Sequence, residues 1–459
     1  MIKQELYDLV QNLQPLCTKM CRTLWNNPEV GGTEAKSSSY LKKLLEQEGF
    51  AVTVCPNLPY AFCAEYGSGS PVLAVLAEYD ALPGLSQKAC AVKEPAVEGG
   101  PGHGCGHNLL GSAAMTAAIA LKRYLEKSGT PGTVRLYGCP EEELLDGKIK
   151  MIAEHFFDGC DAALTWHPAD SNMVHDRGYL ANTAMKFSFS GRTSHAAFAP
   201  QLGRSALDAV ELMNVGVNYL REHVVDKTRI HYTTDSGGFA PNIVPDKAGS
   251  WYFVRAPKVS DVRDTARRVE LVAQGAATMT ETTVRVSHGY GCCEFKENNA
   301  FGDLAYANLI EADGPKYTEK EINFAADLQK TLSPGTAEKN QSLYHMPGGV
   351  LYSGVGERAL WKDCEMTASS DTGDISYLMP ACLFTTACWP IGVAPHTWQS
   401  AASAGTTIGE KAALYAAKVL SGIGFDLYAR PELLRRIRRE FDDRDDGSYA
   451  PILADADYQ

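Results

Sequence analysis

The hydrophobic and polar positions in the first part of the chain repeat one scheme. Residues 1–50 have the spacing of helices, and two short strand-like runs follow, AVTVC and AFCAEY. Residues 72–80, VLAVLAEYD, form a continuous apolar run that ends in polar residues, which is typical of a strand buried on both faces of a sheet. A helix around 109–126, the strand TVRLYGCP, a helix around 146–157 and the strand AALTWHP come next. This alternation predicts an α/β fold with a mostly parallel sheet.

The pattern changes near residue 183. The run TAMKFSFSG alternates polar and apolar residues, which indicates a half-exposed antiparallel strand. A helical segment, SALDAVELMNVGVNYLREHV, then precedes two strand-like runs, IHYTTDSGG and SWYFVRAP, a helix at 260–279 and the strand TTVRVSHGY. This strand–helix–strand–strand–helix–strand order predicts a small ferredoxin-like domain over residues 183–292.

The larger domain therefore consists of two parts, residues 1–182 and residues 293–459. Its second part contains a late core strand, LFTTACWP, and a closing helix at about 401–421. The charged tail that starts at Arg430 is expected to pack loosely, as chain ends often do.

Composition narrows the class of protein. The chain has 459 residues, 45% of them hydrophobic and 21% charged, as in soluble globular proteins of two or three domains. A net charge of −12 argues against nucleic acid or a membrane surface as a partner, but it permits an anionic small substrate. The first residues read as an amphipathic helix rather than a signal peptide. The thirteen cysteines lack disulfide-like spacing, which predicts buried thiols and a cytoplasmic location.

Side chains with metal-binding or acid–base chemistry follow the predicted strands. In an open α/β sheet, ligands bind beyond the carboxyl ends of the strands. A glycine-rich run, HGCGHN, adds a thiol and an imidazole two residues apart, and its glycines allow both to face one point. The candidates gathered in this way are Glu78, Asp80, Cys105, His107, Glu141, Glu142, Glu143, His167 and His396.

Such a set could hold two divalent metal ions. Cysteine, histidine and carboxylate are the usual ligands of transition metals, and a carboxylate beside the activated water can serve as a general base. The neighbours Glu142 and Glu143 point in different directions as they leave a strand, so they can divide these roles. Taken singly, each residue has a plainer reading, as a solvated acidic turn, a packed histidine or a helix cap. A nucleophilic cysteine–histidine pair is a further alternative, whereas the absence of GK[ST] excludes a phosphate loop.

Several motifs together resemble a known family. They are EYDALP, HGCGHN, YGCPEEE, TWHP, SGRTSHAA, SSDTGDISY and APHTWQ, and they span nearly the whole chain. The sequence resembles the dinuclear metallopeptidases related to aminoacylase and carboxypeptidase G, in their amidohydrolase branch. Within this branch, its motif sequences are most similar to those of B-subunits of aminobenzoyl-glutamate hydrolase. The resemblance implies a catalytic domain of the aminopeptidase type with an inserted lid and dimerisation domain.

The resemblance also implies roles for the candidate residues. Glu142 would be the general base and acid, and Asp80 would orient a ligand, whereas Glu78 is expected not to be one. Cys105 would be the bridge between two divalent ions, zinc or manganese. The implied metal ligands are Cys105, His107, Glu143, His167 and His396.

Residues of the inserted domain would act on the substrate. His195 would reach the active site of a partner subunit and stabilise the oxyanion. Asn242 and Arg255 would bind the free carboxylate of the substrate, a task that suits the bidentate guanidinium group. The implied assembly is a homodimer, or a hetero-oligomer with a related subunit.

The implied activity is metal-dependent hydrolysis of the amide bond of an N-acyl amino acid or a dipeptide-like substrate, such as an aminobenzoyl-glutamate-type conjugate. Two alternatives remain, a catalytically silent partner subunit and a cysteine amidase. The chain departs from its relatives at Asn108, where aspartate is usual, and at Leu144 and Leu145, where glycines are common. His103 and His175 are interpreted as structural residues or as residues that support the metal ligands without binding an ion.

Overall fold

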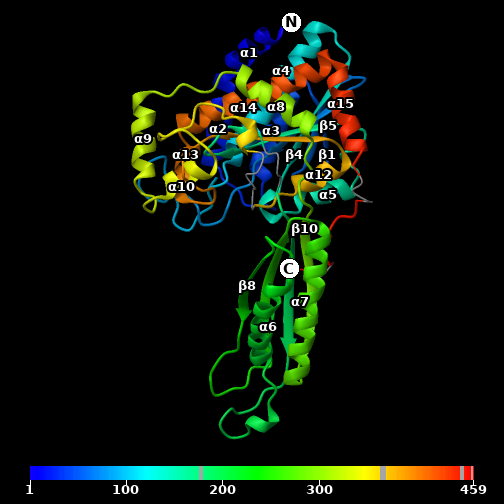
Figure 1. Ribbon diagram of the computed structural model, residues 1–459, viewed down its shortest axis with the longest axis vertical. Helices are drawn as coiled ribbons and strands as arrows, with labels where there is room; N and C mark the ends of the chain where they lie inside the picture. The colour runs from blue at the N-terminus through cyan, green and yellow to red at the C-terminus, as the bar shows by residue number, and fades with distance from the viewer. Residues whose placement is uncertain (175–178, 362–367, 445–448, 456–457, 459) are drawn as a thin grey trace. The chain divides into compact units, whose positions relative to one another are not determined.

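The computed structural model describes residues 1–174, 179–361, 368–444, 449–455 and 458 (Figure 1). These residues form two compact units. The first contains residues 1–174, 296–361 and 375–444, and the second contains residues 179–295, 368–374 and the described residues from 449 onward.

The first unit is built on a seven-stranded sheet with the order β1-β2-β4-β3-β5-β11-β6. The neighbours β4, β3, β5 and β11 are parallel to one another, and the outer strands pair antiparallel. This confirms the mostly parallel sheet predicted for the catalytic domain. The strands are β1 Ala51–Val54, β2 Phe62–Ser68, β3 Val72–Glu78, β4 Gly132–Cys139, β5 Ala162–Ala169, β6 Met173–Val174 and β11 Ala381–Ala387.

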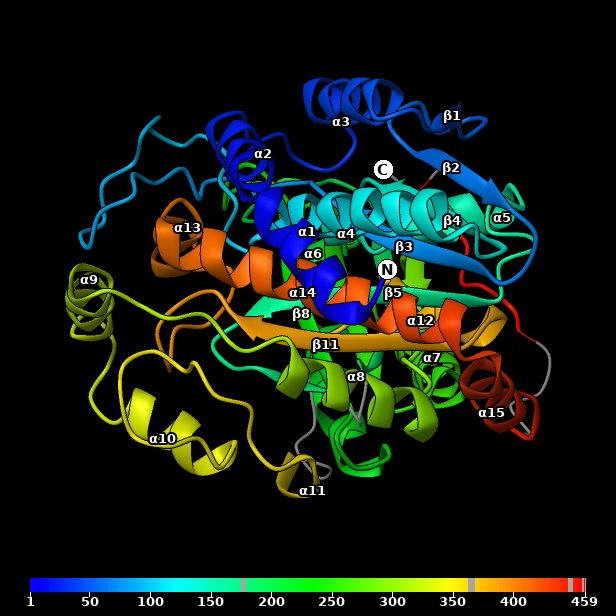
Figure 2. The same ribbon diagram turned by 90° about the horizontal axis from the view of Figure 1, so that it is seen from above.

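Two long helices, α4 (His107–Ser128) and α14 (Thr407–Ala429), pack side by side across this sheet (Figure 2). Gly111 lets α4 approach β3 closely, since a Cβ atom there would lie 2.6 Å from the carbonyl oxygen of Glu78. The other helices are α1 Lys3–Asn12, α2 Gln14–Asn26, α3 Ala35–Gln47, α5 Gly147–Ala153, α8 Asn299–Glu311, α9 Glu319–Gln329, α10 Thr336–Leu343, α11 Arg358–Trp361, α12 Thr372–Leu378, α13 Trp398–Ala404 and α15 Pro431–Asp442.

Two expectations for the C-terminal region were wrong. The closing helix is divided into α13 and α14 at Gly405, where a Cβ atom would lie 2.3 Å from the Trp25 ring and where Thr406 caps the second helix. The segment after Arg430 is not loose, because it forms α15. Its Ile437 is 1% exposed, and the carbonyl of this residue accepts a 2.9 Å hydrogen bond from Asn298.

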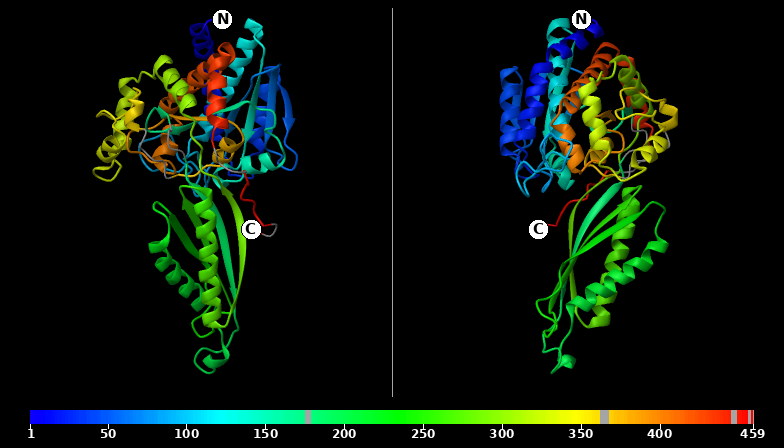
Figure 3. Two further views of the ribbon diagram at one scale, coloured as in Figure 1. Left: turned by 45° about the vertical axis from the view of Figure 1, so that its right-hand side comes forward. Right: turned by 90° about the vertical axis from the view of Figure 1, so that its left-hand side faces the viewer.

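The second unit has an antiparallel four-stranded sheet with the order β10-β7-β9-β8. Both of its helices pack on one face of that sheet around a separate apolar core (Figure 3). This order is the ferredoxin-like arrangement expected from the sequence. The elements are β7 Ala181–Ser190, α6 Ala206–Leu220, β8 Arg229–Ser236, β9 Lys247–Ala256, α7 Val259–Thr280 and β10 Thr283–Cys292.

A search for membrane-spanning segments gave none: no helix in the described ranges combines the length and apolar character that a bilayer span requires.

Candidate metal centre

The residues that follow the parallel strands meet at one edge of the first unit. Their donor atoms form three overlapping groups, and within each group all donor atoms lie within 4.8 Å of one another. Glu78 ends β3, the turn Glu142–Leu144 follows β4, and His167 lies in β5. The groups are Cys105, His107 and His167; Cys105, Glu143 and His396; and Glu78, His107 and Glu142.

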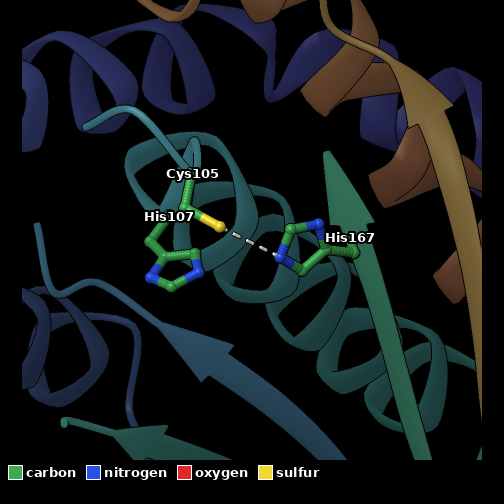
Figure 4. Close-up of side chains that lie close together, drawn as sticks. All are labelled: Cys105, His107 and His167. Carbon is green, nitrogen blue, oxygen red and sulfur yellow. Dashed lines mark hydrogen bonds between the residues drawn. The ribbon is translucent and has the colours of Figure 1, made fainter. Parts of the chain in front are cut away.

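The first group lies where α4 begins beside β5 (Figure 4). Cys105 Sγ is 3.4 Å from His167 Nε2, and the rings of His107 and His167 are nearly perpendicular at 87°. His167 Nδ1 donates a 2.8 Å hydrogen bond to the carbonyl of Pro168, so the lone pair of Nε2 faces the thiol. Burial lowers the pKa of His167 to about 4. The imidazole is therefore neutral near pH 7, as a metal ligand must be.

His107 is completely buried and is held by Asp80. Its Nδ1 donates a 2.7 Å hydrogen bond to Asp80 Oδ1, and Nε2 is directed into the group. In the neutral ring, Nε2 carries a lone pair. Among the described residues, Nε2 has no hydrogen-bond partner. It lies 3.4 Å from Glu78 Oε2 and 3.8 Å from Glu142 Oε2. Buried polar atoms are nearly always partnered, and a carboxylate behind an imidazole is typical of metal-binding histidines.

Glu143 and His396 form the opposite side of the site. Glu143 Oε2 is 3.4 Å from His396 Nε2, and Glu143 Oε1 is buried without a hydrogen-bond partner in the described part of the chain. Burial raises the pKa of Glu143 to about 7. Its backbone N–H donates a 2.9 Å hydrogen bond to Asp80 Oδ2. Asp80 thus positions residues on both sides of the site.

The distances between donor atoms fit divalent ions better than hydrogen bonds. Two pairs, Glu78 with His107 and Glu143 with His396, are 3.4 Å apart, beyond the usual range of about 2.7–3.2 Å for an N–H···O hydrogen bond. Two ligands at about 2.0–2.3 Å from a tetrahedral ion are separated by roughly 3.3–3.6 Å. Cys105 belongs to both the histidine-rich group and the group of Glu143 and His396. Its sulfur is therefore placed where one thiolate could serve two ions.

The turn that carries the glutamates is strained and held from two sides. It lies between two non-glycine residues in the left-handed region, Glu141 at φ 63° and Leu145 at φ 58°. Glu34 Oε1 accepts a 2.8 Å hydrogen bond from the Glu141 N–H, and Asp80 holds Glu143 as described above. Left-handed backbone in non-glycine residues often accompanies functional sites.

The other candidates lie in the second unit. His195 is exposed, and its Nδ1 accepts hydrogen bonds from the N–H groups of Ala197 and Phe198 at 3.3 and 3.1 Å. The carbonyl of Asn242 accepts a 3.0 Å hydrogen bond from Ala196, so Asn242 lies beside the His195 turn. Arg255, on β9, donates a 3.1 Å hydrogen bond to Ser369 Oγ.

The contacts of several buried polar residues near the site could not be predicted from the sequence. Asn108 is buried, and its amide donates to the carbonyls of Cys21 and Ala404 at 3.3 and 3.1 Å, which an ionised aspartate could not do. His103 Nε2 lies 3.2 Å from the Leu24 carbonyl, and His175 lies outside the described residues. Isolated charged residues such as Glu34 have no spacing that marks them as part of a site.

Comparison with known proteins identifies the family. Residues 74–378 match the model of peptidase family M20/M25/M40. The chain is 40% identical to the B-subunit of p-aminobenzoyl-glutamate hydrolase from Escherichia coli over 95% of both chains, and 28% identical to Xaa-Arg dipeptidase of Mus musculus over 92% and 88%. Its fold is similar to that of a dinuclear metal-binding peptidase of family M20 from Bacillus subtilis, with a TM-score of 0.61, 17% identity and coverage of 92% and 99%.

The chain therefore belongs to peptidase family M20/M25/M40. It is a hydrolase, and within this family a metal-dependent amidohydrolase. The family resemblance inferred from the motifs is confirmed.

The backbone of the glutamate turn leads to a stability prediction. A left-handed conformation costs a non-glycine residue about 1–2 kcal/mol, and replacement by glycine removes this strain. Glycine also loses more conformational entropy on folding, which cancels about 0.5–1 kcal/mol of that gain. Leu145→Gly should therefore leave the free energy of unfolding unchanged or raise it by up to about 1.5 kcal/mol. Leu144→Gly is the control, because Leu144 is not left-handed and should lose about 1 kcal/mol. Urea unfolding of the metal-free proteins measures both, and equal losses would contradict the strain.

Proposed function

We propose that this chain hydrolyses the amide bond of an N-acyl amino acid or a dipeptide-like substrate with the aid of two divalent ions. The observation that carries the proposal is the donor set in which the buried Cys105 belongs to two groups. The relatives named above support the substrate class, since one belongs to a p-aminobenzoyl-glutamate hydrolase and another is a dipeptidase. An aminobenzoyl-glutamate-type conjugate is accordingly the first substrate to test.

The donor groups divide into two ligand sets. Cys105 with His107 and His167 would hold one ion, and Cys105 with Glu143 and His396 would hold the other. Zinc and manganese are the candidates, and the thiolate ligand favours zinc because both are soft. When bound, the ions supply polarisation of the amide carbonyl and a lower pKa for water.

Glu142 is proposed as the general base and acid. Glu142 is 5% exposed, and its carboxylate lies beside His107, close enough to reach a water molecule in the centre. In this role it accepts one proton as water attacks the amide carbon. It then gives that proton to the amide nitrogen as the carbon–nitrogen bond breaks, so its own charge is restored at the end of each cycle.

The ferredoxin-like domain, over residues 183–292, is proposed to act as lid and dimerisation domain. His195 would stabilise the oxyanion in the active site of a partner subunit. Arg255 and Asn242 would bind the free carboxylate of the substrate, because a guanidinium group recognises a carboxylate through paired hydrogen bonds. The proposed assembly is a homodimer. Its proposed substrate is a small molecule.

A second candidate is a partner chain without activity of its own, because the Escherichia coli relative is one subunit of a hydrolase. The nearly complete burial of Glu142 within the candidate ligands argues for an active chain instead. A cysteine amidase is less well supported, because the sulfur of Cys105 lies among metal donors and burial raises the pKa of its thiol. This effect disfavours the nucleophilic thiolate.

The central test is hydrolysis of a panel of N-acyl amino acids by the purified chain, with and without a chelator. We expect hydrolysis that a chelator abolishes and that zinc or manganese restores. Activity that survives chelation but is lost on thiol alkylation would identify a cysteine amidase. Two bound ions without hydrolysis of any substrate would favour the silent partner chain.

The role of Glu142 predicts a specific kinetic defect. Glu142→Gln should keep both metal ions and lower kcat at least about 100-fold, because a general base usually contributes this much. Steady-state kinetics and metal analysis of the same preparation give the two readouts. Glu141→Gln is the matched control, because the carboxylate of Glu141 pairs with Lys150. Near-normal turnover by Glu142→Gln would refute the assignment.

The role of Arg255 predicts a change in substrate preference. Arg255→Ala should raise KM about ten-fold or more for substrates with a free carboxylate and leave their amidated analogues largely unaffected, because a charge-assisted pair contributes about 1.5–3 kcal/mol. Arg229→Ala is the control, since Arg229 is exposed and faces Arg255 across the β8–β9 pair. Equal losses for anionic and neutral substrates would show that Arg255 does not bind the carboxylate.

A further inference from the structure

A buried ion pair adjoins the candidate metal centre. Glu78, at the end of β3, lies opposite Lys148 of α5, and the distance from Glu78 Oε1 to Lys148 Nζ is 2.7 Å. The two side chains are 3% and 0% exposed. Removing two charges from water costs several kcal/mol per ion, and the attraction between the charges does little more than offset this desolvation penalty. Such a pair therefore adds little to the stability of the fold. Its position beside His107 calls for another explanation.

The second carboxylate oxygen of Glu78 faces the ring of His107. Glu78 Oε2 is 3.4 Å from His107 Nε2. When the ring is neutral, as in a metal ligand, Nδ1 carries the proton that Asp80 accepts and Nε2 presents a lone pair. Two lone pairs that face each other repel unless a positive group lies between them. The distance exceeds that of a normal N–H···O hydrogen bond, but it matches the separation of two ligands on one tetrahedral ion. The unpartnered nitrogen of His107 points to the same position.

Lys148 restricts the conformation of the Glu78 side chain. Because the ammonium group binds Oε1, the rotamer of Glu78 is fixed and Oε2 is the oxygen that faces His107. The lysine also supplies one positive charge beside a cluster that already contains Glu78, Glu142 and Asp80. A cation can then share the donors of this group without an excess of uncompensated negative charge around it.

We propose that Glu78 is an additional protein donor to the ion held by His107, and that Lys148 is a positioning residue that fixes its free oxygen. This inference rests on the proposed function for the presence of an ion. It reverses the expectation from the sequence that Glu78 is not a ligand, and it gives a role to a lysine that the proposed mechanism does not use.

The experiment is direct metal titration of the metal-free protein. Calorimetry with Zn²⁺ and with Mn²⁺ is carried out on the wild type, on Glu78→Gln, on Lys148→Met and on the double variant. Thermal unfolding of each metal-free protein is measured alongside. The two single variants break the same ion pair, but only Glu78→Gln removes the donor charge. They therefore separate a ligand from a merely structural pair.

We expect Glu78→Gln to weaken one of two metal sites at least about ten-fold, the lower end of the range for groups that support a metal ligand. Lys148→Met should bind metal as tightly as the wild type or more tightly, because its unpaired carboxylate needs a cation. The double variant, which contains neither buried charge, should regain thermal stability relative to Glu78→Gln without regaining metal affinity. A change in the visible spectrum of the Co²⁺-loaded protein should accompany Glu78→Gln.

Wild-type affinity in Glu78→Gln or in the double variant would overturn the inference. Equal weakening by Glu78→Gln and Lys148→Met would also overturn it, because the pair would then act only through the fold. These failures differ from failure of the proposed function, in which the wild type itself would bind no zinc or manganese.

Discussion

One buried carboxylate connects the parts of the candidate centre. Asp80 follows β3 and makes two hydrogen bonds in opposite directions, to the imidazole of His107 at the start of α4 and to the backbone of Glu143 after β4. Each bond fixes a group from a different segment relative to the same end of the sheet. The distance between the two ligand groups is therefore set by a side chain that need not touch an ion itself. Asp80 therefore fixes the relative positions of His107 and Glu143 at the end of the sheet.

Close backbone packing makes that arrangement possible. At Gly106, φ is 80°, and a Cβ atom there would lie 2.9 Å from Pro168, the residue after His167. Gly111 allows the same helix to lie against the end of β3. Gly106 and Gly111 thus do more than bend the chain. They remove the side chains that would otherwise separate α4 from the two strands that carry its partners.

The sequence was informative where chemistry follows a periodic pattern. Buried strands can be recognised from continuous apolar runs, and ligands cluster where such strands end, so Asp80, His167 and the glutamate turn could be found without coordinates. The ferredoxin-like order was also readable from alternation alone. Long-range contacts were not readable in this way. Lys148 is a single charge with no spacing relative to Glu78, and the break at Gly405 depends on a ring contributed by Trp25 from the far end of the chain. The left-handed backbone of Leu145 depends on the whole turn around it, because leucine itself disfavours that conformation.

The position of β11 has a consequence for the order in which the protein matures. This strand is inserted between β5 and β6, although residues 181–292, which form the second sheet, lie between them and β11 in the chain, and His396 lies in the loop that follows β11. During synthesis, the ribosome therefore releases the thiol, the glutamates and two of the histidines long before the last ligand. Until β11 enters the sheet, only part of the donor set exists. Completion of the sheet and assembly of the full donor set are therefore one late event in folding, and metal binding by this set would follow it.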